Sequence, residues 1–231
     1  MREAAAIIGA LSVCIASAPA WAHEEGDIVL GIVGGSLTTS FLSTDGHVFV
    51  SNLPAFPTEF DLHEGSLLAH HPRFLADAGT FSPGAEIGFN IRAPLSIWIG
   101  PGYAPIDPRI GPTLTVELAS LGLSATTTSG PVPGFSVLAD IEGGLAATVE
   151  YILNGPAGDD PEPGVYLLEI EFVTDMPGVG VSRPTWLVMN HGMDELTFET
   201  AFAYVFDFLV PAPGSIAVIF LPLIARRRRR F

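Results

Sequence analysis

The sequence predicts an all-β fold, an antiparallel β-sandwich with one short C-terminal helix, set between two apolar terminal segments. Many short runs of alternating apolar and polar residues favour strands, and turns rich in Gly and Pro separate them. The 231 residues include 25 Gly and 20 Pro, which suits a chain with many turns. In addition, helical spacing of apolar residues is confined to one segment near the C-terminus.

The N-terminal segment is typical of a secretory signal peptide. Met1–Glu3 carries one arginine, Ala4–Ile15 is apolar, and Ala20-Trp21-Ala22 offers small residues at both positions that signal peptidase inspects. We therefore expect residues 1–22 to be removed by signal peptidase on export. Cleavage after Ala22 makes His23 the first residue of the mature chain.

The first strands of the mature chain are expected to form a hairpin. Asp27–Val33 is strand-like, Gly34-Gly35 makes a turn, and Leu37–Leu42 is the partner strand. Asp45-Gly46 marks a further turn before a short strand at residues 47–51. From Asn52 to Phe81 the pattern loosens, and we expect an irregular stretch there that is the first place to look for a binding surface.

Further strands alternate with loops through the middle of the chain. The loops are expected at Gly100–Pro112, where four prolines exclude regular structure, and at the acidic Asn154–Gly164. The expected strands are Ala85–Ile91, Leu95–Ile99, Thr113–Leu118, Phe135–Leu138, Leu145–Leu153, Val165–Val173 and Pro184–Met189. In Val165–Val173, alternation predicts one core face and one face, with Leu167, Glu169 and Glu171, that is mostly in water.

The helix is predicted to follow Asp194, which can cap its N-terminus. Its apolar residues recur at spacings of three and four: Phe198, Phe202, Val205, Phe206 and Leu209. Pro211 ends it. Residues 23–209 are therefore expected to form a single β-sandwich domain.

Charge and cysteine content exclude several functions. Without residues 1–22 and the arginines at 226–230, the chain keeps 4 Arg, no Lys and 24 acidic residues, a formal charge of −20. Such a surface disfavours nucleic acid and anionic lipid, which both need clustered cations. Cys14 is the single cysteine and leaves with the signal peptide, so no disulfide or thiolate site remains.

The last residues, 210–231, combine three parts of a membrane-sorting tail. Pro211, Ala212, Pro213 and Gly214 break the chain, Ile216–Ala225 is apolar, and a block of five arginines follows: Arg226, Arg227, Arg228, Arg229 and Arg230. The apolar run partitions into lipid and the arginines stay on the cytoplasmic side. The alternative is a plain tail anchor or an amphipathic terminus, since a full span needs about 20 residues.

This tail resembles the PEP-CTERM sorting signal of exported bacterial proteins. The resemblance rests on Pro211–Gly214, the apolar run and the arginine block, and departs from the family where Ala212 replaces the usual glutamate. It implies an exosortase-type enzyme as the partner that recognises the tail. The chain would be anchored in the inner membrane during sorting, and then reach the cell surface, the outer envelope or the medium.

Catalysis is not expected. The sequence has no Gly-x-Ser-x-Gly elbow, phosphate-binding loop, His-Glu-x-x-His motif or EF-hand loop. Glu169 and Glu171 share one strand face, as solvent-facing residues of a strand do. A carboxylate pair for glycoside hydrolysis is defined by its separation in space, which sequence does not give.

Histidines suggest a zinc or copper site as the alternative function. His63, His70 and His71 lie close in sequence with Asp61, Glu64 and Asp77, and these residue types ligate such metals without thiolates. A mature N-terminal His23 could chelate a metal through its amine and its ring, and Asp27 or another histidine could complete the shell. The plainer explanation is a loop with solvated histidines and no cofactor.

A second resemblance bears on the metal. The chain is similar to a group of PEP-CTERM proteins from planctomycetes and cyanobacteria, some of them linked to zinc regulation, at His23 with Gly26-Asp27-Ile28, at Pro163–Glu171 and at Pro184–Asn190. Where several members carry His-x-His, this chain has Leu145-Ala-Ala147. The sequence thus leaves two hypotheses, a sorted envelope protein with a structural or interaction role and a divalent-metal module.

Overall fold

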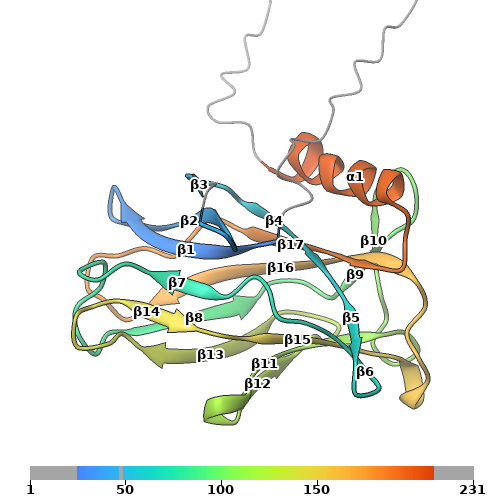
Figure 1. Cartoon of the computed structure of the whole chain (residues 1–231), viewed down its shortest axis with the longest axis horizontal. Helices are drawn as coiled ribbons and strands as arrows, with labels where there is room; N and C mark the ends of the chain where they lie inside the picture. The colour runs from blue at the N-terminus through green and yellow to red at the C-terminus, as the bar shows by residue number, and fades with distance from the viewer. Residues whose placement is uncertain (1–24, 47–48, 211–231) are drawn as a thin grey trace, which may run out of the picture.

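A computed structural model describes residues 25–46 and 49–210, and it confirms the all-β fold with one short helix near the C-terminal end of this part. The described residues form three sheets, which lie in layers beneath the helix α1 (Figure 1). The expected signal peptide, His23 and the sorting tail beyond Val210 lie outside the described residues.

The first sheet contains the predicted hairpin. Strand β1 (Gly26–Val33) pairs antiparallel with β2 (Ser36–Ser43) through a turn in which Gly34 and Gly35 have φ of 60° and 79°. Glycine takes these left-handed values without strain from a Cβ atom. The sheet order is β14-β7-β1-β2-β3, completed by β3 (Phe49–Val50), β7 (Phe74–Ala76) and β14 (Leu145–Ala147).

The second sheet is built on the longest strand, β16 (Gly164–Thr174). Its central order is β10-β9-β16-β17-β4, and β8 pairs with both β16 and β13. Its other strands are β4 (Ala55–Glu59), β8 (Glu86–Ile91), β9 (Ser96–Trp98), β10 (Tyr103–Pro105), β13 (Val132–Leu138) and β17 (Thr185–His191).

The third sheet has the order β12-β11-β15-β6-β5. Its strands are β5 (Asp61–His63), β6 (Ser66–Ala69), β11 (Thr113–Leu118), β12 (Leu123–Thr126) and β15 (Glu150–Asn154). Two short 3-10 turns lie in its connections, η2 (Ala119–Leu121) and η3 (Pro156–Gly158).

Three details of the expected strand pattern are wrong. The stretch from Asn52 to Phe81, expected to be irregular, contains four strands, β4 to β7. The loop at 100–112 contains β10, and the run 145–153 is divided between β14 and β15, which belong to different sheets. Pairing is also mixed rather than purely antiparallel, because β7 runs parallel to β1 and β4 runs parallel to β17.

One large core lies between the sheets. Phe74 packs edge-on against Phe89 and Phe172, with ring centroids 5.8 and 5.0 Å apart. The inward residues of β16, Tyr166, Leu168, Ile170 and Phe172, all belong to this core, as alternation predicts. Aromatic rings packed edge to face contribute about 0.5–1.5 kcal/mol beyond their buried area.

The helix covers the opposite face of the second sheet. In α1 (Glu195–Tyr204), the predicted cap is confirmed, because the Thr197 N–H donates to Asp194 Oδ1 over 3.1 Å. A π-helical turn, η4 (Val205–Leu209), continues it. Phe198 and Phe202 bury Leu167, Trp186 and Val188 beneath them. Leu167, on the face of β16 that was expected to be mostly in water, is buried because α1 lies over this half of the strand (Figure 1).

Candidate functional site

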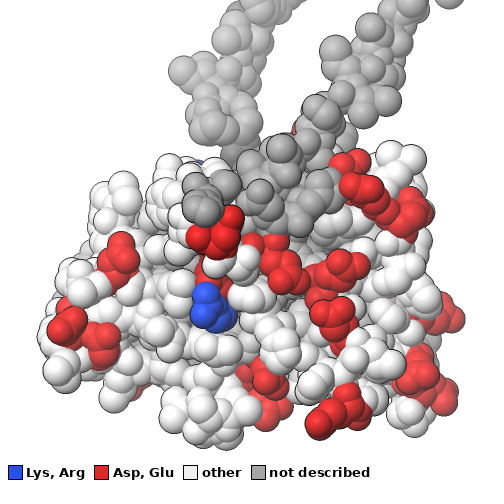
Figure 2. Space-filling view, in the orientation of Figure 1, with Lys and Arg blue, Asp and Glu red and all other residues white. Residues whose placement is uncertain are grey.

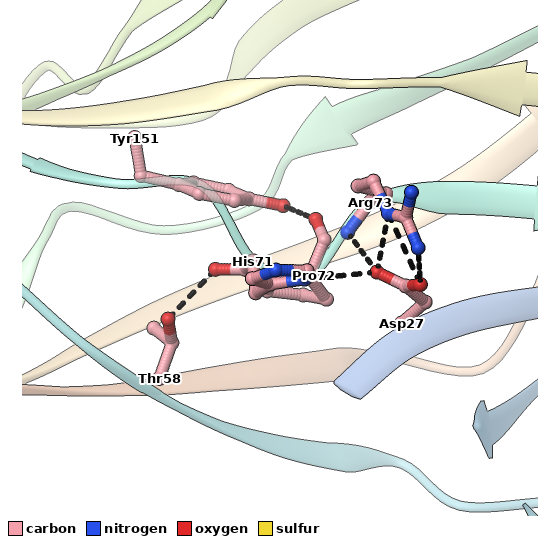
Figure 3. A network of polar contacts seen from close by, with 6 residues as sticks. All are labelled: Asp27, Thr58, His71, Pro72, Arg73 and Tyr151. Atoms are coloured by element: carbon pink, nitrogen blue, oxygen red, sulfur yellow. Dashed lines mark hydrogen bonds and ion pairs between the residues drawn. The ribbon is translucent and has the colours of Figure 1, made fainter. Parts of the chain in front are cut away.

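The expected metal ligand Asp27 is a buried carboxylate in a partly buried ionic network (Figure 3). Its carboxylate, on β1, is 1% exposed. Arg73 donates to it from Nε to both oxygens, over 3.0 and 3.1 Å, and from its backbone N–H over 3.0 Å. A second guanidinium N–H donates to Oδ2 over 2.5 Å, and His71 Nδ1 lies 3.1 Å from Oδ1. Both carboxylate oxygens are therefore occupied by cationic or polar partners.

The segment that carries these partners is itself held from two sides. The Thr58 hydroxyl, on β4, donates to the His71 carbonyl over 2.7 Å, and the Tyr151 hydroxyl, on β15, donates to the Pro72 carbonyl over 2.8 Å. Asp27 lies on β1 of the first sheet, and Arg73 directly precedes β7 of the same sheet. Thr58 lies in the second sheet and Tyr151 in the third. We call Asp27, Thr58, His71, Pro72, Arg73 and Tyr151 the three-sheet junction.

The electrostatics of the junction keep Asp27 ionised. Burial acts to raise the pKa of Asp27, but hydrogen bonds from Arg73 and His71 outweigh it and hold the pKa below its ordinary value. The hydrogen bond to Asp27 in turn raises the pKa of Arg73. Burial, and then the charge of Asp27, raises the pKa of Tyr151 well above its ordinary value. Tyr151 is thus a neutral donor, and Asp27 is an anion whose lone pairs are already used.

The expected metal ligands fall into two separate groups. Asp27 and His71 meet in the junction, whereas His63 and His70 lie together on its outer side, with ring centroids 6.5 Å apart. His70 is 53% exposed and its Nδ1 lies 3.8 Å from the Glu150 carboxylate. Within residues 25–46 and 49–210, no three histidine or acidic side chains converge in a way that could hold a metal. The metal site that includes His23 therefore stays a prediction.

Arg73, Tyr151 and Thr58 were not identified from the sequence as part of this site. A usable indication existed for Arg73, because only four arginines lie between residues 23 and 225, among 24 acidic residues. Where arginines are so few, one that lies next to a strand is a candidate partner for a buried carboxylate, which its guanidinium can bind with several N–H groups. The positions of Thr58 and Tyr151 had no such indication, because their partners are backbone carbonyls distant in sequence.

A second ionic group lies on the outer face of β16. Arg92 donates from Nε to Glu169 over 3.1 Å and from Nη1 to Glu171. The Asn90 side-chain amide also donates to Glu171, over 3.4 Å. The hydrogen bond to Glu171 is the largest cause of the raised pKa of Arg92. Arg92 is 42% exposed. Glu169 and Glu171 lie on the open side of the sheet, as the alternation predicts, and both are paired with one cation.

An apolar cavity of about 10 Å³ lies in the core between the sheets. Phe74, Phe89 and Phe172 are among its walls, and nearly all of its lining is apolar. A space of this volume holds at most one water molecule, and the lining offers no partners for that water. The cavity therefore provides no ligand-binding site.

Across the described part of the chain, no helix is both long enough and apolar enough to span a bilayer. The signal-cleavage residues Ala20 and Ala22 and the sorting residues Pro211–Gly214 and Arg226–Arg230 fall outside this part, so their roles stay predictions.

No protein-family model matches this chain, and a comparison with curated proteins finds no match either.

Proposed function

We propose that this chain is an exported envelope protein, sorted through its C-terminal tail, with a structural or interaction role rather than a catalytic one. Signal peptidase would remove residues 1–22, and an exosortase-type enzyme would recognise residues 210–231. The cargo is the β-sandwich between these two segments.

The observation that carries this proposal is the agreement between the fold and the expected processing sites. The first strand begins at Gly26, shortly after Ala22, and the last helical turn ends at Leu209, just before Pro211. Between these two points the described elements pair with one another in three sheets and share two apolar cores. We therefore expect the sheets, the helix and the three-sheet junction to remain folded after both segments are removed.

The surface supports an extracytoplasmic role. Figure 2 shows acidic side chains spread over one face of the molecule with little basic surface among them. A strongly negative protein stays soluble and repels other anionic surfaces, including nucleic acid. The fold is stabilised without any disulfide, since the mature sequence has no cysteine.

The test is to express the full-length chain in a bacterium with an exosortase and in its exosortase-deletion strain, and to fractionate the cells. We expect release to the envelope surface or medium with the enzyme, and retention in the inner membrane without it. Replacing Arg226–Arg230 by serine should abolish the difference, whereas the matched replacement Arg109→Ser in an exposed loop should preserve it. The same location in both strains would contradict the sorting proposal.

A further inference from the structure

An aromatic cluster lies where the described chain ends. Trp98 on β9 contacts Tyr103 on β10 and Tyr204 on α1 edge-on, each with ring centroids 5.3 Å apart. Tyr204 in turn stacks on Phe208 of η4, with centroids 4.6 Å apart and an interplanar angle of 27°. We call Trp98, Tyr103, Tyr204 and Phe208 the aromatic patch.

The patch is only partly covered by protein. Phe208 is 70% exposed, and Ile99, next to Trp98 in the turn after β9, is 63% exposed. In contrast, Phe198 and Phe202 of the same helix are buried against the sheet. The Tyr103 hydroxyl donates to the Ala201 carbonyl over 3.2 Å, so this edge of the patch is anchored to α1. Exposed aromatic surface of this kind, on an anchored base, marks an interaction site.

The sequence after the patch restricts what can cover it. Leu209 and Val210 pack against the same cluster as Trp98 and Tyr103, so the chain leaves the described part beside the patch. Five residues, 211–215, separate Val210 from the apolar run that begins at Ile216. Even fully extended, five residues span at most about 18 Å. A headgroup layer is roughly 6 Å thick, so a membrane-inserted run would keep the patch close to the lipid surface.

Trp and Tyr side chains are suited to that location. Their rings are apolar at one end and polar at the other, and they concentrate where a protein crosses the boundary between lipid and water. The exposed Asp207 beside Phe208 and the charge of the whole domain oppose an anionic surface. The lipid that fits is therefore zwitterionic.

We propose that, while the tail holds the protein in the membrane, the aromatic patch rests on a zwitterionic lipid surface and fixes the orientation of the sandwich. This inference depends on the proposed function, because it requires Ile216–Ala225 to enter the bilayer. It adds that the domain is seated on the membrane rather than swinging freely on its linker. The groups that would contact the lipid are the rings of Trp98 and Phe208 and the turn at Ile99.

The mature chain is well suited to a direct test, because its tryptophans are Trp98 in the patch and Trp186 beneath α1. The chain from His23 to Phe231 is reconstituted into phosphatidylcholine vesicles with ordinary or brominated acyl chains, and tryptophan emission is compared. Trp186→Phe leaves Trp98 as the reporter, and Trp98→Phe leaves Trp186. Bromine near the interface should reduce Trp98 emission about twofold and leave Trp186 emission nearly unchanged.

Two surface variants sharpen the test. Phe208→Ser, made in the Trp186→Phe chain, should reduce the quenching of Trp98. Ile141→Ser, at a residue 91% exposed in the turn before β14, should preserve it. Unchanged melting temperatures would show that both variants are folded. Exchange of part of the phosphatidylcholine for phosphatidylglycerol should weaken the quenching.

Vesicle flotation distinguishes insertion of the tail in the membrane from docking of the aromatic patch on the lipid surface. A chain that floats with the vesicles while Trp98 is no more quenched than Trp186 would overturn docking and leave the membrane tail standing. A chain that does not float would overturn the membrane tail, and docking with it. Equal quenching in the Phe208→Ser and parent chains would also contradict the assigned surface.

Discussion

Two arginines of this protein pair with carboxylates that differ in burial, Arg73 with one carboxylate and Arg92 with two. Arg73 pairs with Asp27, whose carboxylate is 1% exposed, and the pair connects to backbone carbonyls through His71 and Pro72. Arg92 pairs with Glu169 and Glu171 on an open sheet face. The two arginines are similarly exposed, at 39% and 42%, but Asp27 is 1% exposed whereas Glu169 and Glu171 are 28% and 17% exposed. The cost of losing a partner should therefore differ by several kcal/mol.

The largest effect is expected from Arg73→Met, which leaves the Asp27 carboxylate buried without its cation. Breaking a buried ion pair on one side costs about 3–5 kcal/mol of unfolding free energy. Urea unfolding of the variant should show this loss, while Arg109→Met should match the parent. A loss below about 1 kcal/mol would mean that the Arg73–Asp27 pair stabilises the fold no more than an ordinary surface ion pair does.

Asp27→Asn should cost less, about 1.5–3 kcal/mol at neutral pH, because the Arg73 side chain left behind is 39% exposed and stays hydrated. This cost depends on pH. The folded-state pKa of Asp27 lies below the ordinary 3.8, so the unfolded chain takes up the proton first on acidification.

The contribution of the Asp27 charge is therefore complete above the ordinary aspartate pKa and lost as pH falls through the folded-state pKa. Unfolding free energies of parent and Asp27→Asn should converge as the pH is lowered below about 4. A difference between the two proteins that stays constant over that range would show that the charge is not what stabilises the junction.

Tyr151→Phe tests the third sheet's part in the junction. It removes the hydroxyl that donates to the buried Pro72 carbonyl and should cost about 1–3 kcal/mol. Tyr204→Phe, at the partly exposed ring of the aromatic patch, is the matched control and should change the melting temperature little. Equal effects would mean that the hydrogen bond to Pro72 is replaced by another donor.

Histidine variants separate the junction from a metal site. His71→Ala should cost about 1 kcal/mol without any metal, because it removes a partner of Asp27. His70→Ala, on the exposed side, should stay within about 0.5 kcal/mol of the parent. A rise in melting temperature with zinc or copper that His70→Ala abolishes would support metal ligation. Changing both histidines together would confuse the two effects.

The smallest effect is expected from Arg92→Ala. An exposed pair contributes about 0–1 kcal/mol, and salt screens it further. Urea unfolding at low and high ionic strength should show a small loss that shrinks with salt. A salt-independent loss as large as that of Arg73→Met would remove the contrast between the two groups.

Local pattern was sufficient for much of the fold. Alternation placed β1, β2, β11, β16 and β17 to within a few residues, and the spacing after Asp194 placed the helix. It did not find β4, in which four consecutive residues, Ala55–Thr58, are buried. A strand covered on both faces has no alternation, and its parallel pairing with β17 joins residues far apart in sequence.

The run 145–153 shows a different limit. Its alternation continues without interruption, but β14 pairs with β7 in the first sheet and β15 pairs with β6 and β11 in the third. The alternation of apolar and polar residues predicts which side chains face inward, but it does not predict which sheet the strand joins. The same limit applies to the site, where adjacent His70 and His71 point to different surroundings. Only tertiary structure shows that Asp27 belongs to Arg73.

The most direct test of the whole account is the intact mass of the protein recovered from outside the cytoplasm. A chain that begins at His23 would agree with export, signal removal after Ala22 and a folded domain that starts at β1. A chain that still begins at Met1, or that is found in the cytoplasm alone, would contradict export and remove the basis for sorting and for membrane docking.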